Sequence, residues 1–346
     1  MRKTPISLAL QGGGAHGAFT WGVLDRLLDE PGFDPCAISG CSAGAMNAVV
    51  LAHGWQQGGA SAAQLALRQF WEAVSQESPL AWLAVPGSSA LADKVSFSWH
   101  QMLAQTLSRT AVADLSPLDV NPLRQLLQQQ IDFDRLRAPD ALRLFISATD
   151  VASGQLRVFR NADLSLDALL ASACLPTLHR TVEVDGRAYW DGGFSANPAI
   201  HPLVYEAAPA DILLVLLQPS ERHPLPRSAS EIADRTAELG FGSNLLRELR
   251  AITLARQYAG RWRWWGGRLE RRLKRLRFHL LEPDELLAEL PRASKYDTRS
   301  AFLQRLFQAG REQAGQWLEA NGNAVGRRAS VDLERLYGEP LELVEG

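Results

Sequence analysis

The stretch Gly40-Cys41-Ser42-Ala43-Gly44 constrains the fold of this chain more than any other, because it joins an expected strand to an expected helix through a glycine-rich turn. Residues 36–39 are apolar and partly β-branched, as in a buried strand, and residues 45–52 are small and apolar, as in a buried helix. A sharp turn brings its flanking residues close to neighbouring backbone, where a Cβ atom would clash. The Gly-x-Ser-x-Gly pattern therefore predicts a turn that exposes the Ser42 hydroxyl as a nucleophile, although an ordinary glycine-rich turn also fits it.

A second glycine-rich turn, Gly12-Gly13-Gly14-Ala15-His16-Gly17, lies between an expected strand at residues 5–10 and an expected helix at residues 19–28. Its Gly-x-Gly-x-x-Gly spacing fits a dinucleotide-binding turn, but that use requires an acidic residue at the end of the next strand, which ends instead in the Ser42 turn. Consecutive N–H groups at a helix N-terminus can also stabilise an oxyanion. The nearby serine favours this second use over nucleotide binding, and a plain tight turn remains a third interpretation.

The composition indicates an ordinary globular chain of 346 residues, with 46% hydrophobic residues, 21% charged residues and a net charge of -2. Its three cysteines are too few for a disulfide framework and fit a reducing compartment. The apolar run at residues 6–10 is too short for a signal peptide, and no apolar stretch approaches the length of a membrane span. We therefore expect a cytoplasmic protein.

Strand and helix patterns alternate along the first 220 residues or so of the chain. Further strands are expected at residues 142–148, 155–159, 182–184, 187–190 and 212–217. Helices are expected at residues 62–74 and 167–174, and from Asn121-Pro122 and Asn197-Pro198 onward. This alternation predicts an α/β fold of three layers, α/β/α, with a central, mostly parallel sheet. Between Pro79 and Trp99 the pattern is irregular, and either a lid or a buried connecting loop fits it.

A serine hydroxyl needs a positioned base to attack a carbonyl at neutral pH. His201 and His279 follow Asp191 in the chain order of Ser-acid-His enzymes, but one lies in an expected helix and the other in a strand-like run. Asp191 itself directly follows the expected strand at residues 187–190 and precedes Gly192-Gly193. A lone carboxylate can act as the base where a partly apolar site raises its basicity.

Four blocks of the chain together resemble the bacterial members of the patatin-like phospholipase family. In family order they are Gly12–Gly17, Gly40–Gly44, Ala171-Ser172-Ala173-Cys174-Leu175-Pro176 and Asp191-Gly192-Gly193. The resemblance extends over about residues 5–215. One departure is His16, which stands where the family commonly carries arginine or lysine.

The resemblance implies a Ser42–Asp191 dyad without a catalytic histidine, a metal ion or a cofactor. Ser42 would attack an acyl ester of a phospholipid or another lipid, and Asp191 would be the base. The remaining site residues it implies are the oxyanion loop (Gly12, Gly13, Gly14, Ala15 and Gly17), the turn around the nucleophile (Gly40, Cys41, Ala43 and Gly44) and the pair after the base (Gly192 and Gly193). We therefore expect a serine lipid acyl hydrolase of the phospholipase A or lysophospholipase type. A Ser-His-Asp carboxylesterase and a nucleotide-binding protein remain the alternatives.

The composition changes after residue 218, so we expect a catalytic domain at residues 5–218 and a helical, basic extension at residues 219–346, packed on or near it. The Arg- and Trp-rich segment 261–277 fits a peripheral contact with an anionic membrane surface, and a surface helix packed on the core fits it equally well. Without a base-reading motif, no nucleic-acid partner is expected.

Within this extension, residues 279–281 fit a further strand, and residues 298–318 fit a last helix. The tail after Asn321-Gly322 is expected to be loosely ordered.

Overall fold

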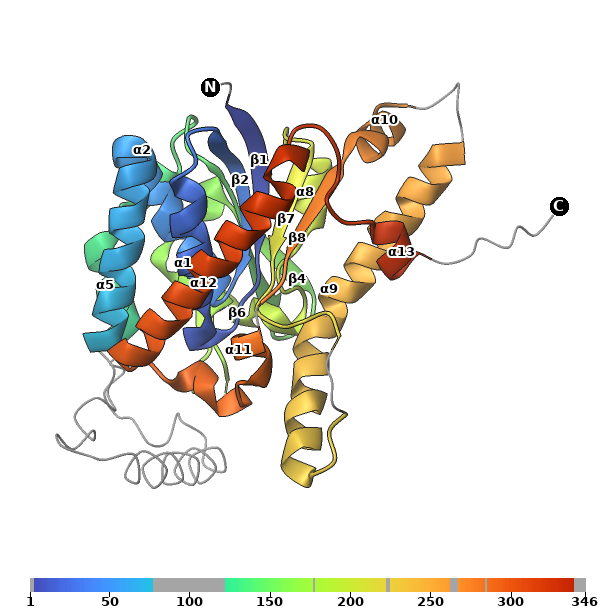
Figure 1. Cartoon of the computed structure of the whole chain (residues 1–346). Coiled ribbons are helices and arrows are strands. Elements are labelled where there is room, and N and C mark those ends of the chain that lie inside the picture. The colour runs from blue at the N-terminus through green and yellow to red at the C-terminus, as the bar shows by residue number, and fades with distance from the viewer. Residues whose placement is uncertain are drawn as a thin grey trace.

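The computed structural model describes residues 3–76, 122–176, 178–221, 225–261, 267–283 and 285–338. Within these residues the strands form one eight-stranded sheet in the order β5-β6-β3-β2-β1-β7-β8, with β4 paired to β3 outside this path (Figure 1). The strands are β1 Thr4–Leu10, β2 Phe33–Cys41, β3 Arg143–Asp150, β4 Leu156–Arg160, β5 Val182–Val184, β6 Arg187–Asp191, β7 Asp211–Val215 and β8 Arg277–Leu281. The expected strands are therefore all present, with small shifts at their ends.

The five strands β3, β2, β1, β7 and β8 run parallel, whereas β4, β5 and β6 pair antiparallel at one side. Residues 6–10 of β1 are all buried, as expected for a parallel strand with both faces covered by helices. The carboxyl ends of parallel strands meet at one edge of the sheet, and β2 ends there directly before Ser42.

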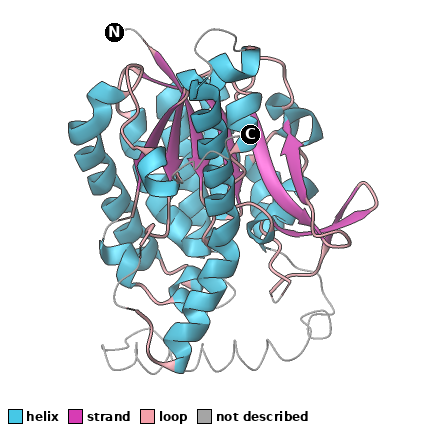
Figure 2. Ribbon diagram, turned by 90° about the vertical axis from the view of Figure 1, so that its right-hand side faces the viewer, coloured by secondary structure: helices cyan, strands magenta, loops and turns pink. Residues whose placement is uncertain are grey.

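Helices cover both faces of the sheet (Figures 1 and 2). They are α1 Gly17–Leu28, α2 Ala43–Gln76, α5 Pro122–Gln130, α6 Phe133–Leu136, α7 Leu166–Ser172, α8 His201–Tyr205, α9 Ala229–Arg261, α10 Arg268–Arg275, α11 Glu285–Glu289, α12 Ser300–Asn321 and α13 Leu333–Tyr337. Alternate residues of β7 join different cores, because successive strand side chains point to opposite faces. Leu213 and Val215 pack with α1, α2 and α12, whereas Ile212 and Leu214 pack with α8, α9 and α13. The expected three-layer α/β/α architecture is confirmed.

The chain after residue 218 is not only helical, since it contributes β8 to the central sheet and α12 to one of its faces. The helices α1 and α12 cross where each presents a glycine. A Cβ atom on Gly22 would overlap the Phe307 carbonyl, and one on Gly310 would overlap the Phe19 carbonyl. This close approach holds α12 firmly against the helix that follows the first glycine-rich turn.

The expectation of a loosely ordered tail after Asn321-Gly322 is wrong for residues 322–338. The Ser330 N–H donates to the Phe278 carbonyl, 3.1 Å away, and α13 packs on α9. The physical reason is that β8 is the last strand of the sheet, and the tail covers an edge that would otherwise expose unpaired backbone groups.

The helix expected from Asn197-Pro198 begins instead at His201. The Glu248 carboxylate of α9 accepts hydrogen bonds from the N–H groups of Ile200 and His201, so a distant side chain sets this helix start.

The irregular stretch between Pro79 and Trp99 and the tryptophans at 262, 264 and 265 lie outside the described residues. Within the described part of the chain, no helix has both the length and the apolar character to cross a membrane.

Candidate active site

Ser42 sits between the last residue of β2 and the first residue of α2, in a left-handed backbone conformation with φ of 52°. This conformation is uncommon for a residue other than glycine and is the strained turn that the sequence pattern predicts. A Cβ atom on Gly44 would overlap the Leu10 carbonyl of β1, and one on Gly40 would lie 2.6 Å from the Gly44 oxygen. The two glycines are needed because the turn lies directly against neighbouring backbone.

Asp191 is the last residue of β6, and its pairing with Ala148 of β3 brings it to the same edge of the sheet as Ser42. The side chain is buried, with 2% of the residue exposed. Burial raises the pKa of its carboxyl group to about 6, and hydrogen bonds from the Gly193 N–H, the Ser42 hydroxyl and the Cys41 thiol limit that rise. The Gly193 nitrogen is 2.7 Å from Asp191 Oδ1. The structure therefore places Ser42 beside a carboxylate of raised basicity.

Cys41 lies beside both residues, and its Sγ atom could in principle act as a second nucleophile. Its Sγ is 3.6 Å from Asp191 Oδ1, and burial, followed by the negative charge of Asp191, raises the pKa of the thiol well above its usual value. A thiol of this kind stays protonated at neutral pH, so it donates a hydrogen bond and is itself a poor nucleophile.

Within the described part of the chain, neither candidate histidine hydrogen-bonds to Ser42, as the Ser-acid-His alternative requires. His279 is paired through Leu213 and Leu8 to Ile38, so it lies three strands away from β2. Three inter-strand spacings amount to about 14 Å. The His201 ring contacts Glu248, with 2.9 Å between Nδ1 and Oε1.

The first glycine-rich turn continues into a short 3₁₀ helix, η1 Gly14–His16, and then into α1. Two of its expected oxyanion donors are already bonded. The Gly12 N–H donates to Asn197 Oδ1 at 2.7 Å, and the Gly17 N–H donates to the Gly14 carbonyl. Within the described residues, the N–H groups of Gly13, Gly14 and Ala15 have no acceptor. These three groups at a helix N-terminus are the remaining donors for an anion.

His16 does not extend toward solvent, as an arginine at this position could, but is buried. Its Nε2 lies 2.7 Å from Ser294 Oγ, and the Ser294 hydroxyl donates to the Pro291 carbonyl at 2.7 Å. Ser294 belongs to η5 Arg292–Tyr296, which covers the glycine-rich turn, and a Cβ atom on Gly14 would overlap the Lys295 carbonyl. The region after residue 218 therefore forms one wall of the candidate site.

The third sequence block, residues 171–176, lies behind the two candidate catalytic residues. Ser172 Oγ accepts a hydrogen bond from the Ser42 N–H at 3.0 Å, and the Cys174 carbonyl accepts one from the Asp191 N–H at 2.8 Å. Sequence reasoning assigned no role to Ser172, Asn197 or Ser294. The Asn197-Pro198 dipeptide is typical of a helix start, which conceals the role of the Asn197 side chain in the site.

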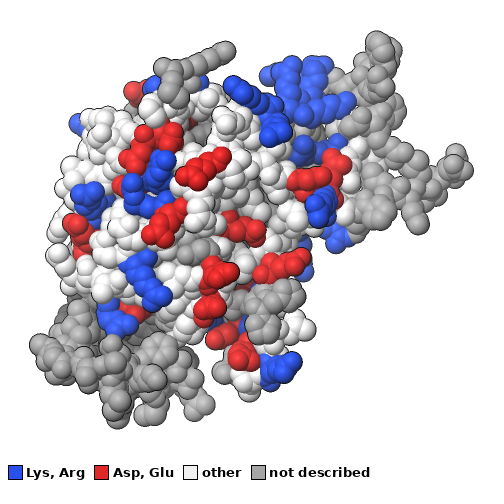
Figure 3. All heavy atoms as spheres, viewed as in Figure 1, with Lys and Arg blue, Asp and Glu red and all other residues white. Residues whose placement is uncertain are grey.

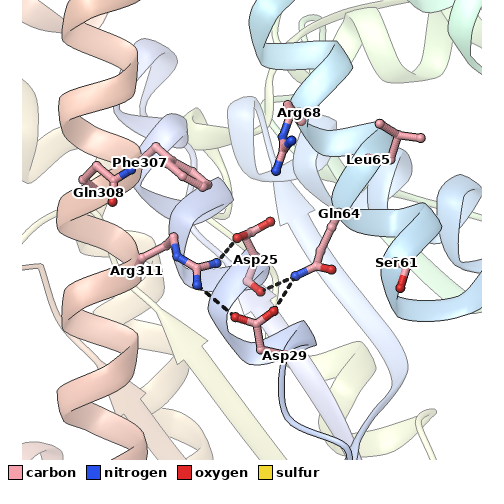
Figure 4. A pocket seen from close by; sticks show the side chains of 9 residues that line it. All are labelled: Asp25, Asp29, Ser61, Gln64, Leu65, Arg68, Phe307, Gln308 and Arg311. Carbon is pink, nitrogen blue, oxygen red and sulfur yellow. Dashed lines mark hydrogen bonds and ion pairs between the residues drawn. The ribbon is translucent and has the colours of Figure 1, made fainter.

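A separate cavity of about 440 Å³ lies between α1, α2 and α12 (Figure 4). Arg311 of α12 reaches across it to the carboxylates of Asp25 in α1 and of Asp29, the residue after α1, and Gln64 of α2 joins the same network. The residues that line this cavity include neither Ser42 nor Asp191. Within the part of the chain that the structure describes, no group of three His, Cys, Asp or Glu side chains could hold a metal ion.

Comparison with known proteins identifies the family. Residues 8–204 match the family model described as patatin-like phospholipase. Because this match covers more than half of the chain, the protein belongs to the patatin-like phospholipase family. No curated protein is significantly similar to it.

Two solved structures are similar to the chain at low sequence identity. VipD from Legionella pneumophila is 15% identical, with a TM-score of 0.40, over 92% of this chain and 67% of VipD. Full-length ExoU, in complex with full-length SpcU from the type III secretion system of Pseudomonas aeruginosa, is also matched. It is 15% identical, with a TM-score of 0.27, over 93% of this chain and 80% of that chain.

Proposed function

We propose that this protein is a serine lipid acyl hydrolase, of the phospholipase A or lysophospholipase type, with a Ser42–Asp191 dyad. The observation that carries the proposal is the placement of Ser42, held at φ of 52°, beside buried Asp191, whose carboxyl pKa is raised to about 6 and is influenced by the Ser42 hydroxyl. A base with a pKa just below neutral is mostly ionised at pH 7 and still accepts a proton readily. Family membership supports lipid esters as the substrate class.

In the proposed reaction, Asp191 takes the proton of the Ser42 hydroxyl while Oγ bonds to the ester carbonyl carbon. The N–H groups of Gly13, Gly14 and Ala15 stabilise the negative charge on the carbonyl oxygen. The tetrahedral intermediate then expels the alcohol, which receives the proton from Asp191. Water, activated by the same carboxylate, hydrolyses the acyl-serine and releases the fatty acid.

We further propose that residues 5–218 carry the catalytic groups and that residues 219–346 complete the sheet and one wall of the site. Contact of segment 261–277 with anionic lipid belongs to the same proposal. Lys and Arg side chains gather over α10, at the edge where the parallel strands begin (Figure 3). Ser42 lies at the opposite edge, so this contact would hold the protein near a membrane without turning Ser42 toward that bilayer.

The test is hydrolysis of a panel of lipids by the wild-type protein and by Ser42→Ala. The panel contains a diacyl phospholipid, a lysophospholipid and a neutral acylglycerol, with free fatty acid as the readout. We expect release of fatty acid from at least one lipid by the wild type and none by the variant. Equal release by both proteins would contradict Ser42 as the nucleophile, and no release by either would contradict the proposed activity.

A further inference from the structure

Asn197 joins the loop that carries the proposed base to the loop that carries the proposed oxyanion donors. Its side chain is buried, with 4% of the residue exposed. Oδ1 accepts the Gly12 N–H at 2.7 Å, and Nδ2 lies 3.5 Å from the Gly12 carbonyl oxygen. Because the Gly12 N–H can only donate, the amide must present its oxygen to it, and one side chain thereby contacts both polar groups of a single residue.

Gly12 lies directly against the turn that carries Ser42. A Cβ atom there would lie 2.6 Å from the Cys41 carbonyl oxygen and 2.8 Å from Ser42 Cβ. The Gly12 backbone therefore rests on the nucleophile turn, and its orientation sets where the next three N–H groups point. With its own N–H bonded to Asn197, Gly12 is left with a supporting role in the oxyanion loop.

The segment that holds Asn197 is itself bonded to the central strands. The Ser39 hydroxyl of β2 donates to the Ala199 carbonyl at 2.6 Å, and the Ala199 N–H donates to Ser147 Oγ of β3 at 3.3 Å. Toward the base, the Ala196 N–H donates to the Gly192 carbonyl at 2.7 Å. Asn197 thus projects from a segment anchored on two strands, which gives it a defined position against which Gly12 is held.

We propose that Asn197 is a positioning residue, which orients the Gly12 backbone so that the N–H groups of Gly13, Gly14 and Ala15 face the oxyanion formed at Ser42. The inference rests on the proposed hydrolase function. The end of β6 and the loop after it then fix the positions of both the base and the oxyanion donors, because Asp191 and Asn197 are only six residues apart. Loss of this orientation weakens interactions made only in the transition state, so it lowers kcat and leaves substrate binding intact.

The test compares the wild type with Asn197→Ala and with the matched control Asn161→Ala. Asn161 also clamps backbone, since it accepts the Leu144 N–H and donates to the carbonyls of Leu136 and Leu142, each at 2.8 Å. Leu144 is paired with Ile38, well before the end of β2, so this second clamp is remote from Ser42. Both variants lose an asparagine side chain that hydrogen-bonds to distant backbone, and only one loses the proposed orientation.

Two inhibitors distinguish an effect on transition-state stabilisation from an effect on substrate binding. An alkyl trifluoromethyl ketone adds to Ser42 and forms an oxyanion, whereas an ether-linked lysolipid has no carbonyl to attack. We expect Asn197→Ala to lower kcat by about 10- to 100-fold and to weaken the ketone by a similar factor, with the affinity for the ether lipid unchanged. Asn161→Ala should leave all three quantities within twofold of wild type. If Asn197→Ala does not fold, Asn197→Gln, which displaces the amide by one methylene, should show the same selective loss.

An unchanged kcat in a folded Asn197 variant would overturn the proposal, and so would an equal loss of affinity for both inhibitors. A kcat loss of the same size in Asn161→Ala would also overturn it, because the effect would then be one of general stability. Failure of the proposed function gives a different result, namely a wild-type protein that releases no fatty acid from any lipid.

Discussion

Replacement of Asp191 by asparagine should make the protein more stable while it abolishes hydrolysis. In the folded state the pKa of the Asp191 carboxyl is raised from 3.8 to about 6, so ionisation of this buried group opposes folding. A shift of about 2 units corresponds to ~3 kcal/mol at a pH above 6. The asparagine side chain would keep an oxygen for the Gly193 N–H and carry no charge. For a chain of this length, 3 kcal/mol corresponds to a rise in Tm of about 4 °C.

The sign of the pH dependence follows from linkage. Between pH 3.8 and about 6 the folded protein holds a proton on Asp191 that the unfolded chain has released, so the free energy of unfolding of the wild type falls as pH rises. The stability advantage of Asp191→Asn should therefore be full above pH 6, about half as large at pH 5, and close to zero near pH 4. The rate shows the opposite trend, since kcat/KM of the wild type should fall tenfold per unit below pH 6.

The assay is thermal unfolding of both proteins from pH 4.5 to 8, together with lipid hydrolysis. Asp211→Asn is the matched control, because Asp211 is equally buried but its carboxyl has a pKa below the usual range. Burial acts to raise that pKa, and hydrogen bonds from His279 and Arg277 outweigh it. The control variant should be less stable than wild type at neutral pH. An Asp191→Asn protein that melts at or below the wild-type temperature throughout this range would refute the reasoning, as would retained hydrolysis.

Three further changes test other parts of the structure. Ser42→Ala should abolish labelling by a fluorophosphonate and leave Tm within about 1 °C, because the backbone strain at φ of 52° is the same for alanine; residual labelling at another residue would identify a different nucleophile. Gly14→Ala should lower stability by about 1–2 kcal/mol more than Gly154→Ala in chemical unfolding, since both have positive φ but only Gly14 faces a carbonyl. Arg311→Ala should lower stability by about 2 kcal/mol, because it leaves a buried carboxylate unpaired, whereas Arg299→Ala, which breaks an exposed pair, should change it by less than about 0.5 kcal/mol.

Most of the fold could be predicted from local patterns. Residues 6–10 of β1 and residues 36–39 of β2 are mostly apolar runs, and their burial on both sides of the sheet is expected from that composition. The pairing of strands could not be read in this way. The strand β8 joins β7 although 61 residues separate the end of one from the start of the other, and no local pattern encodes that choice.

Local sequence patterns likewise predict some residues of the candidate site and miss others. Sequence motifs singled out Ser42, Asp191 and the glycine-rich turn, because a strained turn requires glycine and a reacting serine requires a base. They did not distinguish Gly12, whose N–H is bonded, from Gly13, whose N–H has no acceptor in the described part of the chain. A helix pattern likewise hid Asn197, since its partner lies 185 residues away.

The sequence by itself determined the three-layer α/β architecture, the family and the candidate nucleophile, because each depends on local residue patterns and on their order along the chain. Only the tertiary structure decided that the region after residue 218 contributes a strand to the sheet. It also decided that this region covers one side of the candidate site, where Ser294 contacts His16. It also decided that burial, more than any nearby charge, raises the pKa of Asp191. The physical reason is that desolvation and hydrogen bonds between distant residues arise only when the chain has folded.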